Sequence, residues 1–216
     1  MYSTLSELRA AGRADLKGRW LEAAMLTFVY VLISAILGAT AGGLLDKVLL
    51  GSSFLITVLL LPMEWGKTMT FLSNSRNEDD DPFNVGHLLD GYRGAQYRRI
   101  FTTYLLMYLY IILWTLLLIV PGVIKAISYS MVPYILRDNP ELQNNAAIEK
   151  SMQMMQGHKL RFFYLSLTFL GWIILGILTL GIGLLWVGPY MDATFVRFYE
   201  ELKGEEALGG AEQQND

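Results

Sequence analysis

The sequence predicts an all-α membrane protein whose six transmembrane helices form three hairpins, with amphipathic helices at the membrane surface. Hydrophobic residues make up 53% of the 216 residues and charged residues only 17%, against about 25% charged in a soluble domain. The segment 101–136 holds one basic residue, Lys125, and no acidic residue. Because about 20 apolar residues cross the hydrocarbon core as a helix, this segment favours two crossings joined by a turn.

Further apolar segments before and after this central hairpin extend the transmembrane domain over residues 20–199. Pro121 and Gly122 form the predicted turn of the central hairpin, and Gly181-Ile182-Gly183 that of the last one. The predicted spans are residues 20–45, 48–72, 101–120, 122–136, 162–180 and 182–199.

Each returning helix of the three hairpins carries a proline: Pro62, Pro133 or Pro189. Proline removes a backbone donor and kinks a helix, so we expect a kink at each position. Repeats with interrupted helices occur in transporters, where the freed backbone groups line a site. They also occur in helical bundles that transport nothing, so this pattern indicates repetition more strongly than function.

Polar segments flank and connect the spans. Residues 1–19 predict a surface helix whose basic side chains Arg9, Arg13, Lys17 and Arg19 meet anionic headgroups; a frayed, charged leader is the alternative. The connections 73–100 and 137–161 each contain a short amphipathic helix, the second starting near Pro140. The acidic tail 200–216 is predicted to be disordered.

The basic residues predict the orientation. Lysine and arginine mark the cytoplasmic side of short loops. If both termini and both long connections are cytoplasmic, all but two of the 17 lysines and arginines lie inside. The exceptions, Lys47 and Lys125, lie near the outer turns.

Small residues recur in the first span at Ser34, Gly38 and Gly42. This four-residue spacing lets two helix backbones approach closely. The partner helix is either another span of the same chain or the same helix of a second copy.

Four charged residues fall within or beside the apolar segments: Glu64, Lys67, Asp192 and Arg197. Ionisable groups near the bilayer centre are costly and mark functional candidates. One hypothesis joins the four in a buried cluster between kinked helices that binds a ligand or relays an ion or proton. The other places the two cations at the cytoplasmic interface, where the carboxylates only pair with them.

Short motifs along nearly the whole chain resemble those of a bacterial family of small membrane proteins, domain-of-unknown-function family 975. The motifs occupy Leu16–Trp20, Pro62–Gly66, Trp114–Lys125, Tyr129–Leu136, Asp138–Pro140, Ala147–Ser151, Met154–Lys159, Gly181–Gly183 and Pro189–Tyr190. The resemblance implies a multi-pass protein of the bacterial inner membrane and brings no established activity. Asp192 stands where we expect a neutral polar or small residue, so the resemblance implies no role for it.

Motifs of catalysis are not found in the sequence. It lacks cysteine, a His-Glu-x-x-His metal site and a Gly-x-Ser-x-Gly nucleophile elbow. The net charge of −3 without a basic run argues against a nucleic-acid partner. We therefore expect a non-enzymatic scaffold or regulatory module without metal or cofactor, which contacts membrane lipids and other membrane proteins or a second copy of itself. The alternative is a transporter of small solutes, ions or lipids that uses the polar cluster.

Overall fold

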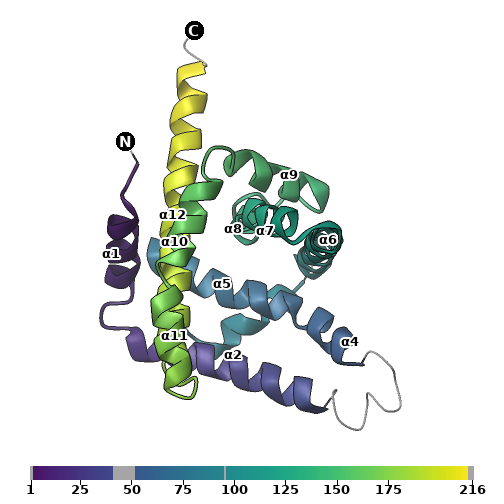
Figure 1. The fold of residues 1–216 in the computed structure, drawn as a ribbon, viewed down its shortest axis with the longest axis vertical. Coiled ribbons are helices and arrows are strands. Elements are labelled where there is room, and N and C mark those ends of the chain that lie inside the picture. The colour runs from purple at the N-terminus through teal and green to yellow at the C-terminus, as the bar shows by residue number, and fades with distance from the viewer. Residues whose placement is uncertain (1, 41–51, 95, 214–216) are drawn as a thin grey trace.

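The computed structural model describes residues 2–40, 52–94 and 96–213, and all regular elements within them are helices (Figure 1). The element η2 is a 3-10 helix and the others are α-helices. Their bounds are α1 Leu5–Asp15, α2 Trp20–Thr40, α4 Ser52–Leu59, α5 Leu61–Arg76, η2 Val85–Tyr92, α6 Gln96–Leu117, α7 Ile119–Ser128, α8 Val132–Asp138, α9 Asn145–Met154, α10 Lys159–Leu167, α11 Leu170–Leu178 and α12 Leu184–Gln213.

Four helical stretches of the described residues are long and apolar enough to cross a membrane. They are Trp20–Ala39, Gln96–Leu117, Ile119–Asp138 and Lys159–Leu178. The predicted span 48–72 begins outside the described residues and is interrupted at Leu60, between α4 and α5. The charged residues of α12 begin at Asp192, within the predicted span 182–199. The structure therefore confirms an all-α chain with four candidate spans, and the count of six stays a prediction.

The helices cross one another rather than standing in one parallel bundle. In Figure 1, α10, α11 and α12 run along the long axis, α2 and α5 run across it, and α6 is seen nearly end-on. Neighbours in the chain still pack together, as α6 does on α7 and α11 on α12. The predicted arrangement of six spans as three hairpins is not confirmed and stays a prediction.

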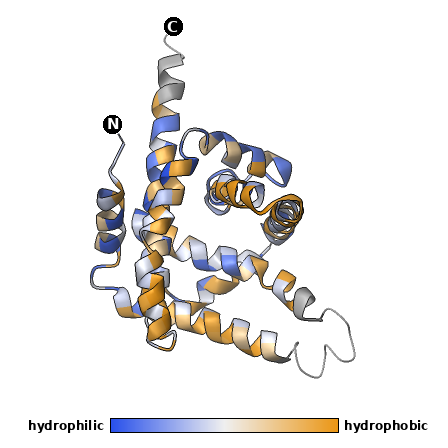
Figure 2. Cartoon of the chain, viewed as in Figure 1, coloured by the Kyte–Doolittle hydropathy of each residue, from blue (hydrophilic) through white to orange (hydrophobic). Residues whose placement is uncertain are grey.

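Apolar residues predominate along α2, α11 and the α6–α7 junction (Figure 2), and many of them are exposed. At that junction the five consecutive residues Leu116–Val120 are between 64% and 79% exposed. Contiguous apolar patches of this kind are rare on soluble monomers. Hydrophilic residues are instead frequent on α1, α9 and the later part of α12 (Figure 2). This separation is compatible with a membrane protein.

The turn of the central hairpin lies earlier than predicted. The chain breaks at Leu118, whose backbone is extended with φ −160° and ψ 140°. Pro121 and Gly122 lie in the first turn of α7, where proline costs no backbone hydrogen bond. A Cβ atom at Gly122 would overlap with Thr115 of α6. Gly122 is thus needed for close contact between the two helices and not for the turn.

The three predicted kink prolines do not act alike. Pro62 and Pro133 lie at the first positions of α5 and α8, so each separates two helices. Pro189 lies inside α12, which continues past it. The first two therefore interrupt their segments, whereas the third does not end its helix.

The small residues predicted for close packing in α2 do not make such contacts in the described chain. A Cβ atom at Gly38 would meet no atom within 4 Å, and Gly42 lies outside the described residues. Ser34 is half-buried beside a pocket. Close backbone approaches occur elsewhere: a Cβ atom at Gly91 of η2 would overlap with Pro62 of α5, and one at Gly12 of α1 with Thr194 of α12. Among the described residues, the small-residue face of α2 therefore has no close neighbour at Gly38.

The polar segments pack against the helices more closely than predicted. Leu8 and Leu16 of the N-terminal segment are buried in the protein, and α1 packs on α12. The helix of the second connection begins at Asn145, five residues after Pro140. The predicted disordered tail is wrong up to Gln213, because α12 continues to that residue. Ion pairs of the tail with α9 and α10 accompany this extension: Lys150 with Glu206 and His158 with Glu205.

Candidate functional site

Three of the four predicted site residues lie close together, and the fourth does not. Lys67 of α5 pairs with Asp192 of α12. Glu64 accepts a hydrogen bond from Tyr108 of α6 and makes no ion pair within 4 Å in the described chain, but it lies near enough to Lys67 and Asp192 to interact with their charges. Arg197 pairs instead with Asp15 of α1. The structure therefore brings Glu64, Lys67 and Asp192 together and separates Arg197 from them.

The Lys67–Asp192 pair links two helices inside the protein. The Lys67 Nζ atom donates to Asp192 Oδ2 at 2.8 Å, and the two side chains are only 16% and 22% exposed. Nζ also lies 5.4 Å from the ring centre of Tyr30 on α2, within the range of a cation–π interaction. Removing one partner of a buried ion pair leaves the other charge without compensation. The pair therefore holds α5 and α12 together, with α2 packed against the lysine.

Arg197 lies about one and a half turns further along α12 and serves a different contact. Its guanidinium donates two hydrogen bonds to the carboxylate of Asp15, whose side chain is 8% exposed. This bidentate pair joins the last residue of α1 to α12. Arg197 therefore stabilises the contact between α1 and α12 and does not form a site with Glu64.

Glu64 lines a largely apolar pocket of about 400 Å³ between α2, α4, α5 and α6. Tyr108 donates its hydroxyl to the carboxylate at 3.0 Å. An ionised carboxylate accepts about four hydrogen bonds, and a phenol supplies one. Glu64 thus has capacity left for a ligand that carries a proton donor or a positive charge. The lining residues are Tyr30, Ser34, Thr57, Val58, Leu60, Leu61, Glu64, Leu105, Tyr108, Leu109 and Ile112.

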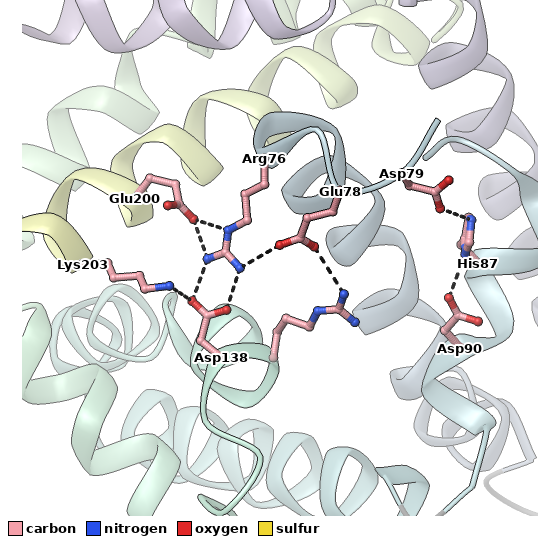
Figure 3. A network of polar contacts seen from close by, with 9 residues as sticks. Arg76, Glu78, Asp79, His87, Asp90, Asp138, Glu200 and Lys203 are labelled. Atoms are coloured by element: carbon pink, nitrogen blue, oxygen red, sulfur yellow. Dashed lines mark hydrogen bonds and ion pairs between the residues drawn. The ribbon is translucent and has the colours of Figure 1, made fainter. Parts of the chain in front are cut away.

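A larger polar network lies where α5, α8 and α12 meet (Figure 3). Arg76 donates two hydrogen bonds to Asp138, at 2.7 and 2.6 Å, and also contacts Glu200 at 2.6 Å. Lys203 and Tyr199 donate to Asp138 at 2.7 and 2.8 Å. The hydrogen bonds from Arg76 to Asp138, followed by those to Glu200, raise the pKa of the guanidinium. The Asp138 carboxylate thus receives donors from two other helices.

The network continues to the first connection through Glu78, which lies 3.5 Å from Arg76 and 3.4 Å from Arg137. Nearby, His87 lies between Asp79 at 3.1 Å and Asp90 at 2.9 Å (Figure 3). These contacts fold the acidic stretch against η2 and α5. Among the described residues no group of His, Asp and Glu side chains has the arrangement of a metal site.

Sequence reasoning missed the Arg76–Asp138 network because its members lie in three separate polar segments. Arg76 and Asp138 are 62 positions apart, and each segment on its own is typical of a solvated connection. One signal was available: Arg76 lies at the carboxyl end of its helix, where a cation is favourable. That signal locates a cation and does not identify its partners.

Comparison with known proteins gives one family match. The family model described as "Protein of unknown function (DUF975)" matches residues 116–206. No curated protein and no solved structure matches the chain. The match supports the resemblance found in the sequence motifs within these residues, whereas the motifs Leu16–Trp20 and Pro62–Gly66 lie before them. Asp138, Asp192 and Arg197 lie within the matched residues, whereas Glu64 and Lys67 lie before them.

Replacing Lys67 tests whether its ion pair is structural. We expect Lys67→Met to lower the free energy of unfolding by about 3–5 kcal/mol, because it leaves Asp192 charged and largely buried. The double variant Lys67→Met/Asp192→Leu should recover most of this loss, since no charge is then left unpaired. Denaturant titration in detergent micelles measures both.

Arg93→Gln is the matched control, because Arg93 also pairs with an aspartate but is 68% exposed. An exposed pair contributes about 0–1 kcal/mol. If Lys67→Met is as mild as Arg93→Gln, the pair does not hold the two helices together.

Proposed function

We propose that this member of the DUF975 family is a non-enzymatic scaffold or regulatory module of the bacterial cytoplasmic membrane. It has six spans, and both termini and both long connections lie in the cytoplasm. The four apolar helical stretches support the membrane location. In this proposal the segments around α4–α5 and the first part of α12 supply the other two crossings. Lysine and arginine then gather on the cytoplasmic side.

The observation that carries the scaffold proposal is the charged assembly on the proposed cytoplasmic side. Arg76, Asp138 and Glu200 join α5, α8 and α12 by ion pairs that are largely shielded from water. Asp15 and Arg197 add α1 to the same helix. From this assembly α12 projects beyond the other helices (Figure 1). A helix that is fixed at this end and extends beyond the others is suited to presenting a surface to other membrane proteins or to a second copy.

A second candidate function is binding or transport of a small solute, ion or lipid. The observation in its favour is the pocket at Glu64, which combines an apolar lining with a carboxylate that has unused acceptor capacity. The division of the predicted cluster counts against a relay. Lys67 and Asp192 pair with each other, although Lys67 also contacts the ring of Tyr30 in the pocket lining. Arg197 pairs with Asp15, and neither of these two residues lines the pocket.

The absence of cysteine gives a direct test of the topology. We expect a single cysteine at Leu180, which is 95% exposed in the last predicted outer turn, to react with a membrane-impermeant thiol reagent in intact spheroplasts. A cysteine at Gln143 in the second connection should react only after the membrane is opened. Labelling of both positions from the same side would contradict the proposed orientation.

The two candidate functions predict different results for one set of variants. If the chain is a scaffold, mild detergent extracts of native membranes contain it in an assembly larger than the purified protein. Asp138→Asn should reduce that assembly, because it weakens the contacts that fix α12. Glu64→Gln should leave it intact. Native gel electrophoresis of the extracts measures the size.

The transport candidate predicts ligand stabilisation instead. A compound from a panel of ions, small solutes and lipids would raise the melting temperature of purified protein, since a ligand at 100 times its Kd adds about 2.7 kcal/mol. Tyr108→Phe and Glu64→Gln would lose this response. The matched control Tyr110→Phe would keep it, because Tyr110 on the same helix bonds Asn145. This result, with no larger assembly in the extracts, would overturn the scaffold proposal.

A further inference from the structure

Three basic residues on one side of the N-terminal helix have no acidic partner. Arg9, Arg13 and Lys17 follow one another at four-residue intervals along α1 and the turn after it. In the part of the chain that the structure describes, no carboxylate lies within 4 Å of them; Asp15 pairs with Arg197, and Glu201 pairs with Arg161. Like charges at this spacing repel one another. An anion bound beside them would relieve that repulsion.

The arginines use only a small part of their hydrogen-bonding capacity within the protein. Arg9 and Arg13 both donate to the hydroxyl of Tyr190, at 3.3 and 3.2 Å. A guanidinium carries five N–H donors in a fork that matches a phosphate. The side chains of Arg13 and Lys17 are exposed. Both are therefore free to contact an anion from outside.

A hollow of about 350 Å³ opens beside Arg13, formed where α1, α2, α11 and α12 meet. It is lined by Arg13, Trp20, Trp172, Trp186, Val187 and Tyr190. A neighbouring hollow along α1 shares Arg13 and Trp20 and adds Lys17. The rings of Trp172 and Trp186 stay 49% and 44% exposed. The surface thus passes from two cations to a group of indole rings.

We propose that this hollow binds one anionic phospholipid, with its phosphate at Arg13 and Lys17 and an acyl chain along Trp172 and Trp186. Basic residues attract anionic headgroups, and large aromatic rings offer apolar surface on which an acyl chain can pack. Charge and shape agree, because the cations lie at one end of the hollow and the apolar rings at the other. The proposal rests on the membrane location proposed above but on neither candidate function.

Lipid binding by the purified chain tests this site without relying on the topology. Delipidated protein in neutral detergent is titrated with phosphatidylglycerol, phosphatidylcholine or inorganic phosphate, and bound lipid is counted by native mass spectrometry. We expect phosphatidylglycerol to bind best. Arg13→Gln should weaken it about fivefold, the effect of removing one charge near a membrane surface. Trp186→Ala should weaken the binding of phosphatidylglycerol and leave the binding of inorganic phosphate unchanged.

Arg98→Gln is the matched control, because Arg98 is an exposed arginine of α6 outside the hollow. It changes the net charge equally and should keep phosphatidylglycerol binding. Equal binding of phosphatidylcholine, or equal effects of Arg13→Gln and Arg98→Gln, would overturn the proposal. Binding of inorganic phosphate as tightly as phosphatidylglycerol would also overturn it, because the hollow would then bind the anion alone and not the lipid. Since Arg13 is exposed, its variant should keep the melting temperature of the lipid-free wild type, which serves as the check of folding.

Discussion

The contact on which the charged end of this protein depends is the one between Arg76 and Asp138. The side chain of Asp138 is only 11% exposed, yet it accepts hydrogen bonds from Arg76, Tyr199 and Lys203. A carboxylate so far removed from water is stable only while its donors remain in place. Because the donors come from α5 and α12, this requirement fixes both helices relative to α8. Glu200 completes the arrangement by neutralising the remaining side of Arg76.

The same requirement explains how other charges are distributed. Lys67 forms an ion pair with Asp192, and Arg161 forms one with Glu201, each at 2.8 Å. These cations therefore stabilise contacts between helices. The basic side of α1 and the carboxylate of Glu64 depart from this pattern. Glu64 accepts a hydrogen bond from the phenol of Tyr108. The arginines of α1 donate to the hydroxyl of Tyr190 and lie over aromatic rings, without a carboxylate beside them in the described chain. A charged side chain without a partner of opposite charge, beside a hollow, can bind a ligand. Both candidate ligand positions, at Glu64 and at the basic side of α1, have this property.

Hydropathy predicted the features of the fold that depend on composition: helical structure throughout and apolar stretches long enough to span a membrane. It could not place the break at Leu118, because Pro121 and Gly122 fit the first turn of a helix as well as a turn between helices. Glu64 and Lys67 lie three positions apart on α5, a spacing at which opposite charges can pair along a helix. Instead α12 and α6 supply better partners, Asp192 and Tyr108, from distant parts of the chain. Such pairing depends on how helices cross, which periodicity within one helix does not encode.

The most direct test of this account is hydrogen exchange of Asp138→Asn and wild type in phosphatidylcholine nanodiscs. Asp90→Asn is the control, since Asp90 pairs with His87 and Arg93 outside the network. If the Asp138 contacts hold three helices as one unit, Asp138→Asn speeds exchange together in 61–76, 132–138 and the part of α12 around Glu200. Faster exchange confined to the residues next to Asp138, or no greater than in Asp90→Asn, would contradict the account.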